Sequence, residues 1–133
     1  MDDKYKTQGM FSWNELMTTN VEEAKEFYAE LFDWQYEEAP MEGGGTYHVA
    51  VVDGVQVGGM FERPANIPEG LPAHWRSYVT VDDVDECADM AGAMGGTVLL
   101  NPTDLPGVGR FCIIQDPQGA VLNLITYPMD MGE

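Results

Sequence analysis

The sequence predicts an α+β fold made of two tandem βαβββ modules, at 11–61 and 73–127, within one domain. A length of 133 residues and a hydrophobic content of 44% suit one domain with a packed core. Each half carries the same helix-start motif before an amphipathic stretch. Each half also places one β-rich run before that stretch and three after it. The repeated order indicates an internal duplication.

The first module is expected to open with a strand over 11–18 and a helix over 21–32. Asn20 is the predicted N-cap, with Glu23 at the capping-box position, and apolar residues then recur every three or four positions. The Asp53-Gly54 pair is typical of a tight β-hairpin turn. The remaining strands of this module are expected over 34–38, 46–52 and 55–61.

The second module repeats these signals. Asp83 is the predicted N-cap, Glu86 stands three residues later, and an apolar stripe runs from Val84 to Met94. The pair Gly95-Gly96 is expected to end this helix, because glycine readily takes the left-handed conformation. Strands are expected over 73–81, 97–100, 111–115 and 120–127.

The two modules align residue by residue. A shift of 63 positions lays Asn20-Val21-Glu22-Glu23-Ala24 on Asp83-Val84-Asp85-Glu86-Cys87, and a shift of 65 lays Gly54 on Gly119. Residues 62–72, with three prolines, are expected to form the linker. Residues 101–110 are expected to form a loop at a cavity rim or a subunit contact, because their glycines match no phosphate-binding motif.

The composition excludes several classes of partner. Six Lys and Arg against 23 Asp and Glu give a net charge of −17, which disfavours nucleic acid and anionic membrane surfaces. The acids are dispersed, which indicates a solvating acidic surface rather than one acidic tail. No apolar run approaches the roughly 20 residues of a membrane span, so a cytoplasmic protein is expected.

Two cysteines, Cys87 and Cys112, are expected to be small buried apolar residues. A disulfide or a reactive thiol is the alternative. The acids around Cys87 disfavour a thiolate there, whereas Arg110 is the one nearby cation that could favour a thiolate at Cys112.

The chain resembles the vicinal oxygen chelate superfamily, which includes glyoxalase I, bleomycin-resistance proteins and extradiol dioxygenases. In that family, paired modules form an open mixed-sheet half-barrel around a cavity for a small molecule, and the resemblance implies the same here. It spans nearly the whole chain, and its most specific segment is the closing one. The segments that carry it are Trp13-Asn14-Glu15-Leu16, Glu26 to Trp34, Gly58-Gly59-Met60, Val81 to Asp85, and Arg110-Phe111 with Gln115 to Val121.

The resemblance implies four positions for a divalent metal, one on the first and one on the last strand of each module. In this chain they fall on Trp13, Gly58, Arg76 and Asn123. Trp and Gly offer no suitable ligand, Arg would repel a cation, and Asn offers one weak carbonyl. We therefore expect no metal cofactor. The fallback is a rebuilt site from His48, His74 and Glu15, the residue two places after Trp13.

Without a metal, the residues at or in phase with those positions become the candidate binding site. Trp13 offers a flat apolar wall, and Arg76 offers a fork for carboxylate or phosphate. Tyr78 and Asn123 could orient a carbonyl or hydroxyl group, and Glu15 is a tentative general base. The alternative is structural: Glu15 and Arg76 neutralise each other, and Trp13 is part of the core.

Three functions stay open. The first is a glyoxalase-like protein or enzyme that acts on or holds a small polar metabolite without metal. The second is a non-catalytic drug-sequestering protein, similar to the bleomycin-resistance members, with acidic walls around a cationic drug. The third is a metal-dependent lyase or dioxygenase. The resemblance also implies a homodimer, and the sequence leaves open whether any catalysis occurs.

Overall fold

The computed structural model describes residues 3–41, 44–64, 72–105 and 108–128. The chain divides into two compact units, each described here by itself. The first-module unit is Trp13–Arg76, and the second-module unit is Met1–Ser12 with Ser77–Glu133. Neither α helix among the described residues is long and apolar enough to cross a membrane.

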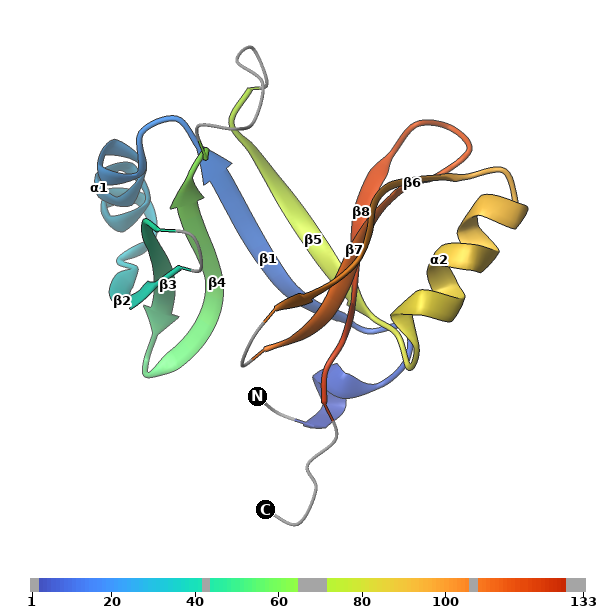
Figure 1. Ribbon diagram of the computed structural model, residues 1–133. Coiled ribbons are helices and arrows are strands. Elements are labelled where there is room, and N and C mark those ends of the chain that lie inside the picture. Colours follow the sequence, from blue (N-terminus) through green and yellow to red (C-terminus); the bar gives the residue numbers. More distant parts are fainter. Residues whose placement is uncertain (1–2, 42–43, 65–71, 106–107, 129–133) are drawn as a thin grey trace. The chain divides into compact units, whose positions relative to one another are not determined.

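The first-module unit is a four-stranded sheet with one helix on one of its faces (Figure 1). The strand order is β2-β3-β4-β1, in which β1 runs parallel to β4 and the other pairs are antiparallel. The Asp53-Gly54 turn joins β3 and β4, with φ of 50° and 79° at its two residues, as a tight hairpin requires. The elements are β1 (Phe11–Thr18), α1 (Val21–Phe32), β2 (Gln35–Pro40), β3 (Thr46–Val52) and β4 (Val55–Glu62).

The second-module unit repeats this plan, preceded by a short 3-10 helix at Asp3–Lys6. Its strand order is β5-β8-β7-β6, with β5 parallel to β8. The α+β class and the βαβββ order of both modules are therefore confirmed. The elements are β5 (His74–Thr80), α2 (Val84–Ala93), β6 (Thr97–Leu105), β7 (Gly109–Gln115) and β8 (Val121–Thr126).

The predicted loop over 101–110 is wrong for most of its length. β6 continues to Leu105 and β7 starts at Gly109, whereas 106–107 lie outside the described residues. Two register shifts in the β6–β7 pairing, between Val98 and Thr103, interrupt the regular pattern that marks a strand in a sequence. Pro102 fits because β6 is the last strand in the order, where a missing backbone donor is tolerated.

Both helices start as the sequence predicts. The Asn20 side chain accepts a hydrogen bond from the backbone N–H of Glu23 at 3.1 Å, and Asp83 accepts one from Glu86 at 3.1 Å. At the end of α1, Asp33 takes φ 60°, and its N–H donates to the carbonyl of Ala29. These contacts fix both helix registers and hence the residues that each helix turns toward its sheet.

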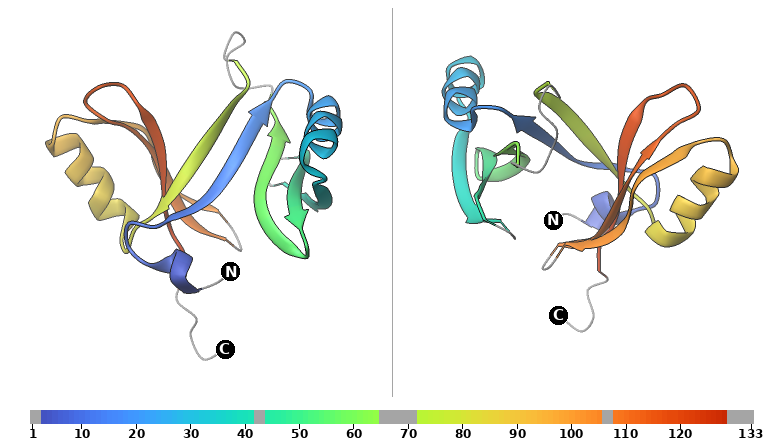
Figure 2. Two further views of the ribbon diagram at one scale, coloured as in Figure 1. Left: turned by 180° about the vertical axis from the view of Figure 1, so that it is seen from behind. Right: turned by 45° about the horizontal axis from the view of Figure 1, so that its top comes forward.

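Each helix packs against its own sheet in a separate core. In the first-module unit, Leu16, Val21 and Met60 form the buried cluster, with Tyr28 among the residues packed on it. In the second-module unit the cluster is formed by Val81, Val84, Ala88, Cys112 and Leu124. Figure 2 shows each helix on one face of its sheet, with the other face free of it. Side chains alternate along a strand, so these clusters also identify the residues on the opposite face.

The strand register corrects the alignment of the two modules by one residue. Leu16 pairs with Met60, and its counterpart Val79 pairs with Leu124, so β4 and β8 are related by 64 positions. The structural counterpart of Asn123 is therefore Gly59, and the prediction of Gly58 is wrong. A register shift in the β3–β4 pairing, which passes from Gly58 to Gln56, accounts for the different spacing of the adjoining turn.

The predicted linker 62–72 is described only at its ends. Glu62 is the last residue of β4, and the N–H of Arg63 donates to the carbonyl of Thr18 at 2.7 Å. Residues 65–71 lie outside the described residues.

Both cysteines are free thiols, so the disulfide alternative is wrong. Cys112 is fully buried in the α2 core, and Cys87 is half-buried beside it. Burial raises the pKa of both thiols, and nearby negative groups add to the effect. Arg110 is engaged elsewhere: its guanidinium bonds Asp85 at 2.9 and 3.0 Å and Asp104 at 3.0 Å.

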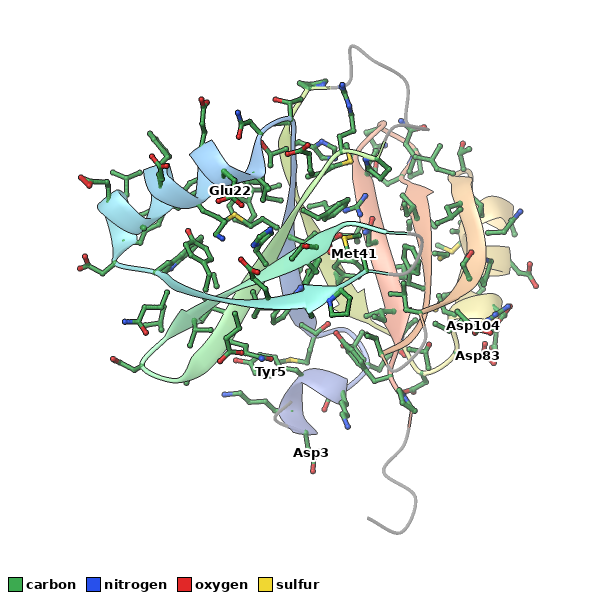
Figure 3. The ribbon with its side chains drawn as sticks, turned by 60° about the vertical axis from the view of Figure 1, so that its left-hand side comes forward. Asp3, Tyr5, Glu22, Met41, Asp83 and Asp104 are labelled. Carbon is green, nitrogen blue, oxygen red and sulfur yellow. The ribbon has the colours of Figure 1, made fainter. Side chains whose placement is uncertain are left out.

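The Arg110 ion pairs tie the start of α2 to the strands β6 and β7. Figure 3 shows Asp104 of β6 and Asp83, the N-cap of α2, on the same side of this unit. The Arg110 hydrogen bonds hold the pKa of Asp85 below its usual range, because they stabilise the charged carboxylate.

Candidate functional site

Three of the five predicted site residues meet on the helix-free face of the first-module unit. Leu16 faces α1, so Glu15 and Trp13 of β1 face the other way. On β4, Met60 faces α1, so Gly59 faces the same side as Glu15, which is its register partner. This face carries the polar side chains that the metal positions of the resemblance led us to expect.

These residues form a hydrogen-bonded chain that includes Tyr47, which the sequence analysis missed. The indole Nε1–H of Trp13 donates to the Tyr47 hydroxyl at 2.8 Å. That hydroxyl donates to Glu15 Oε1 at 2.9 Å, and Arg76 Nε donates to Glu15 Oε2 at 2.7 Å. The Glu15 side chain is buried, so both of its oxygens have partners and its charge is balanced by Arg76. We call Trp13, Glu15, Tyr47 and Arg76 the Glu15 network.

Gly59 makes room for the Tyr47 ring. A Cβ atom at Gly59 would lie 2.0 Å from the Tyr47 hydroxyl and 2.2 Å from Cζ, which real atoms do not permit. In the first-module unit, the Tyr47 phenol therefore fills the position that the Asn123 side chain fills at the equivalent place in the second-module unit. A glycine inside a strand often marks a close approach of this kind, and the Gly58-Gly59 pair was the signal that could have identified Tyr47.

Arg76 keeps part of its donor capacity open. Its guanidinium lies over the Phe61 ring, 5.3 Å from the centroid, and its side chain is 20% exposed. The hydrogen bond to Glu15 uses Nε, and within the described residues the two terminal amino groups donate none. Those N–H groups can bind carbonyl or carboxylate oxygens.

The other two predicted residues are neighbours in the second-module unit. Tyr78 of β5 and Asn123 of β8 are register partners, and Ile113 of β7 is the partner of Asn123 on its other side. Leu124 and Val79 pack in the α2 core, so Asn123 and Tyr78 face the side that α2 leaves free. The Tyr78 ring lies 6.2 Å from that of Phe111.

Asn123 is the polar side chain buried most completely in the described structure. Its exposed fraction is 0%, and neither Nδ2 nor Oδ1 has a hydrogen-bond partner among the described residues. A buried amide without partners is costly, so its presence calls for a physical reason.

The fallback metal site from His48, His74 and Glu15 is wrong. His48 pairs with Met60 and so faces α1, where its Nδ1 lies 3.6 Å from Glu38 Oε2, on the opposite face from Glu15. His74 Nδ1 lies 3.0 Å from the carbonyl oxygen of Pro72. Within the described ranges, no group of three or more His, Cys, Asp or Glu side chains could hold a metal ion.

The donor set at the family positions also does not suit a divalent ion. Glu15 is the one carboxylate of the network, and both of its oxygens are engaged by neighbouring donors. Arg76 adds a fixed positive charge beside it. A metal would have to displace the guanidinium and the phenol before it could reach the carboxylate.

A hollow of about 470 Å³ on the first-module unit lies elsewhere, along α1. Its lining is Glu26, Ala29, Glu30 and Asp33, with none of the residues of the Glu15 network. Figure 3 shows Glu22 of the same helix directed outward from it. The acids of α1 thus belong to the solvated surface that the composition predicts.

A family model described as the Glyoxalase/Bleomycin resistance protein/Dioxygenase superfamily matches residues 11–124. In Mycobacterium tuberculosis (strain CDC 1551 / Oshkosh), the protein named "Putative glyoxylase CFP32" is 40% identical over 118 residues, which cover 88% of this chain and 45% of that protein. "Anthracycline biosynthesis protein DnrV" of Streptomyces peucetius is 32% identical over 123 residues, covering 84% of this chain and 45% of that protein. The chain thus spans about half the length of these relatives.

Solved structures share the fold at low sequence identity. The methylmalonyl-CoA epimerase from Mycobacterium tuberculosis superposes with a TM-score of 0.65 at 12% identity, over 92% of this chain and 93% of that one. The hypothetical protein BH1468 from Bacillus halodurans C-125 superposes with a TM-score of 0.71 at 9% identity, over 96% of this chain and 100% of that one. These likenesses establish the fold.

Proposed function

Because the chain belongs to the Glyoxalase/Bleomycin resistance protein/Dioxygenase superfamily, we propose that it binds a small polar metabolite without a metal ion. The observation that carries the proposal is the Glu15 network. In it, a guanidinium and a phenol donate hydrogen bonds to the two oxygens of the carboxylate that a metal would need as a ligand. Relatives named for glyoxylase and for anthracycline biosynthesis are consistent with small-molecule ligands.

The ligand group that suits this network is a carbonyl or carboxylate oxygen. The terminal N–H groups of Arg76 are donors, and such oxygens accept two parallel hydrogen bonds from a guanidinium. The Phe61 ring supports the guanidinium from one side, and Glu15 fixes its Nε edge. Arg76 is therefore held in position before a ligand arrives, which lowers the entropic cost of binding.

The balance of charge favours this proposal over the sequestering of a cationic drug. Acidic walls would attract a cation, but Glu15 already has a positive partner at 2.7 Å. The network presents open N–H donors and no unpaired carboxylate. A cationic ligand would meet the guanidinium first.

The hydrogen bonds of the Glu15 network support ligand binding better than they support catalysis with Glu15 as the base. Both carboxylate oxygens accept hydrogen bonds, so Glu15 could take a proton from a substrate only after Tyr47 or Arg76 had moved away. The expected homodimer and the cytoplasmic location stay part of the proposal. Light scattering at low and at molar salt measures the molecular mass and so tests the dimer. Salt screens the repulsion between the acidic surfaces of the two subunits, so it should favour the dimer.

The test uses protein NMR to measure whether chelator-treated protein binds pyruvate, malonate and neutral hydroxyacetone. We expect saturable binding that weakens roughly tenfold or more in Arg76→Gln, because a charged hydrogen-bonded pair contributes about 1.5–3 kcal/mol. Arg110→Gln is the matched control, since Arg110 also pairs with carboxylates but lies outside the Glu15 network.

Two outcomes would overturn the proposal. One is equal binding by wild type and Arg76→Gln, and the other is binding that appears only when a divalent metal is added back.

A further inference from the structure

The unpartnered amide of Asn123 has a specific consequence for the ligand. Asn123 offers a donor at Nδ2 and an acceptor at Oδ1, and both are buried with no hydrogen bond to a described residue. Its strand neighbours on either side are Tyr78 and Ile113. Nearby on this face are Phe111, which contacts the Tyr78 ring, and Ile125, so the surroundings are largely apolar.

An apolar residue would be the stabilising choice at such a position. Ala would carry no unsatisfied group and, being smaller than Asn, would not overpack the site. Retaining an amide there lowers the stability of the ligand-free chain. Costs of this kind concentrate at functional sites, where a group must be ready to bind.

From this pattern we infer that Asn123 recognises a ligand group that carries one donor and one acceptor in the same plane, as a carboxamide, lactam or imide does. Such a group pairs with both atoms of the Asn amide by two parallel hydrogen bonds. An ionised carboxylate would satisfy Nδ2 and leave Oδ1 without a donor. The inference rests on the proposed function only in that both assign a small polar ligand to this chain.

The face of the sheet supports this assignment. Asn123 faces away from the α2 core, so a ligand approaches it from the side of this sheet that α2 does not cover (Figure 2). Its side chain is fully covered in the described structure, so the flanking side chains must move aside when a ligand binds. The binding site and the stability cost are therefore predicted at the same residue.

The first test is the stability of Asn123→Ala without ligand. We expect its Tm to exceed that of the wild type by a few degrees, because removing an unsatisfied buried amide is stabilising. Ile113→Val is the control for a change on the same face, and it should lower Tm. A clearly lower Tm in Asn123→Ala would overturn the inference, since the small cavity that it leaves costs little and the loss would mean that the amide already has a structural partner.

The second test uses 2-pyrrolidinone, a lactam with one donor and one acceptor, and N-methyl-2-pyrrolidinone, which lacks the donor. We expect the lactam to shift the Asn123 side-chain NH₂ signals in NMR spectra and the N-methyl compound to bind roughly tenfold more weakly, as loss of one hydrogen bond predicts. Equal binding of the two compounds would contradict the inference.

The two proposals fail in different ways. Lactam binding that survives Arg76→Gln, with no binding of pyruvate or malonate, would refute the proposed function and leave the Asn123 assignment intact. Pyruvate binding that depends on Arg76, together with a destabilised Asn123→Ala, would do the reverse.

Discussion

Replacing Gly59 by alanine should disrupt the Glu15 network without replacing any of its members. The new Cβ atom would lie 2.0 Å from the Tyr47 hydroxyl, 2.2 Å from Cζ and 2.5 Å from Cε2, so the whole ring must move. Tyr47 then loses its hydrogen bonds to Glu15 and from Trp13, at 2.9 and 2.8 Å. The carboxylate keeps Arg76 as its remaining partner within the network.

The size of the effect follows from those contacts. A hydrogen bond to a charged group contributes about 1.5–3 kcal/mol, a neutral one about 1 kcal/mol, and overpacking costs about 1–3 kcal/mol. Because the ring can partly adjust, we expect Gly59→Ala to lower the free energy of unfolding by about 2–4 kcal/mol. For a domain of this length, that is a fall in Tm of about 8–15 °C.

A double-mutant cycle with Tyr47→Ala, measured by urea unfolding, isolates the clash. With the ring removed, Gly59→Ala should cost less than about 1 kcal/mol, because alanine suits a strand better than glycine. Gly92→Ala is the control for a glycine with open space around it, and it should be stabilising in α2. An equal loss from Gly59→Ala with and without the Tyr47 ring would refute the role assigned to Gly59.

Two further predictions concern the second-module unit. Arg110 lowers the pKa of Asp85 below its ordinary value of 3.8, so this pair adds stability above that pH and loses it as the pH falls further. The difference in urea midpoint between wild type and Arg110→Gln should therefore be largest near neutral pH and shrink below pH 3.8, and a difference that grows in acid would contradict the ion pair. Burial raises the pKa of Cys112 to about 11 from 9.0, so its thiolate fraction near neutral pH falls about a hundredfold. Its reaction with a disulfide reagent at pH 8 should be at least that much slower in the native than in the unfolded protein, and rapid modification of Cys112 in the native chain would show that it is accessible.

The fold was predictable because its signals are local. Asn20 and Asp83 are capping residues whose partners stand three positions later, and Asp53-Gly54 favours a particular turn. Each of these depends on a few neighbouring residues and on backbone chemistry. The strand over 97–105 was shortened in the prediction because its register shifts and Pro102 hide the alternating pattern.

The candidate site was predictable only in part, because it depends on registers between distant strands. The prediction placed Glu15 and Arg76 correctly in phase, and the paired arrangement that it left open is the one observed. It chose His48 where the register brings Tyr47, one residue away and on the opposite face. A single residue of strand register reverses every side chain, and no local pattern fixes that register.

Metal content is the measurement that tests the central claim most directly. Protein incubated separately with zinc, nickel, manganese and ferrous iron, then desalted, would be assayed by elemental analysis beside Glu15→Gln. The account predicts substoichiometric metal in every sample, because Arg76 and Tyr47 occupy the Glu15 carboxylate. One tightly held ion per chain, lost in Glu15→Gln, would contradict it and restore metal-dependent chemistry as the function.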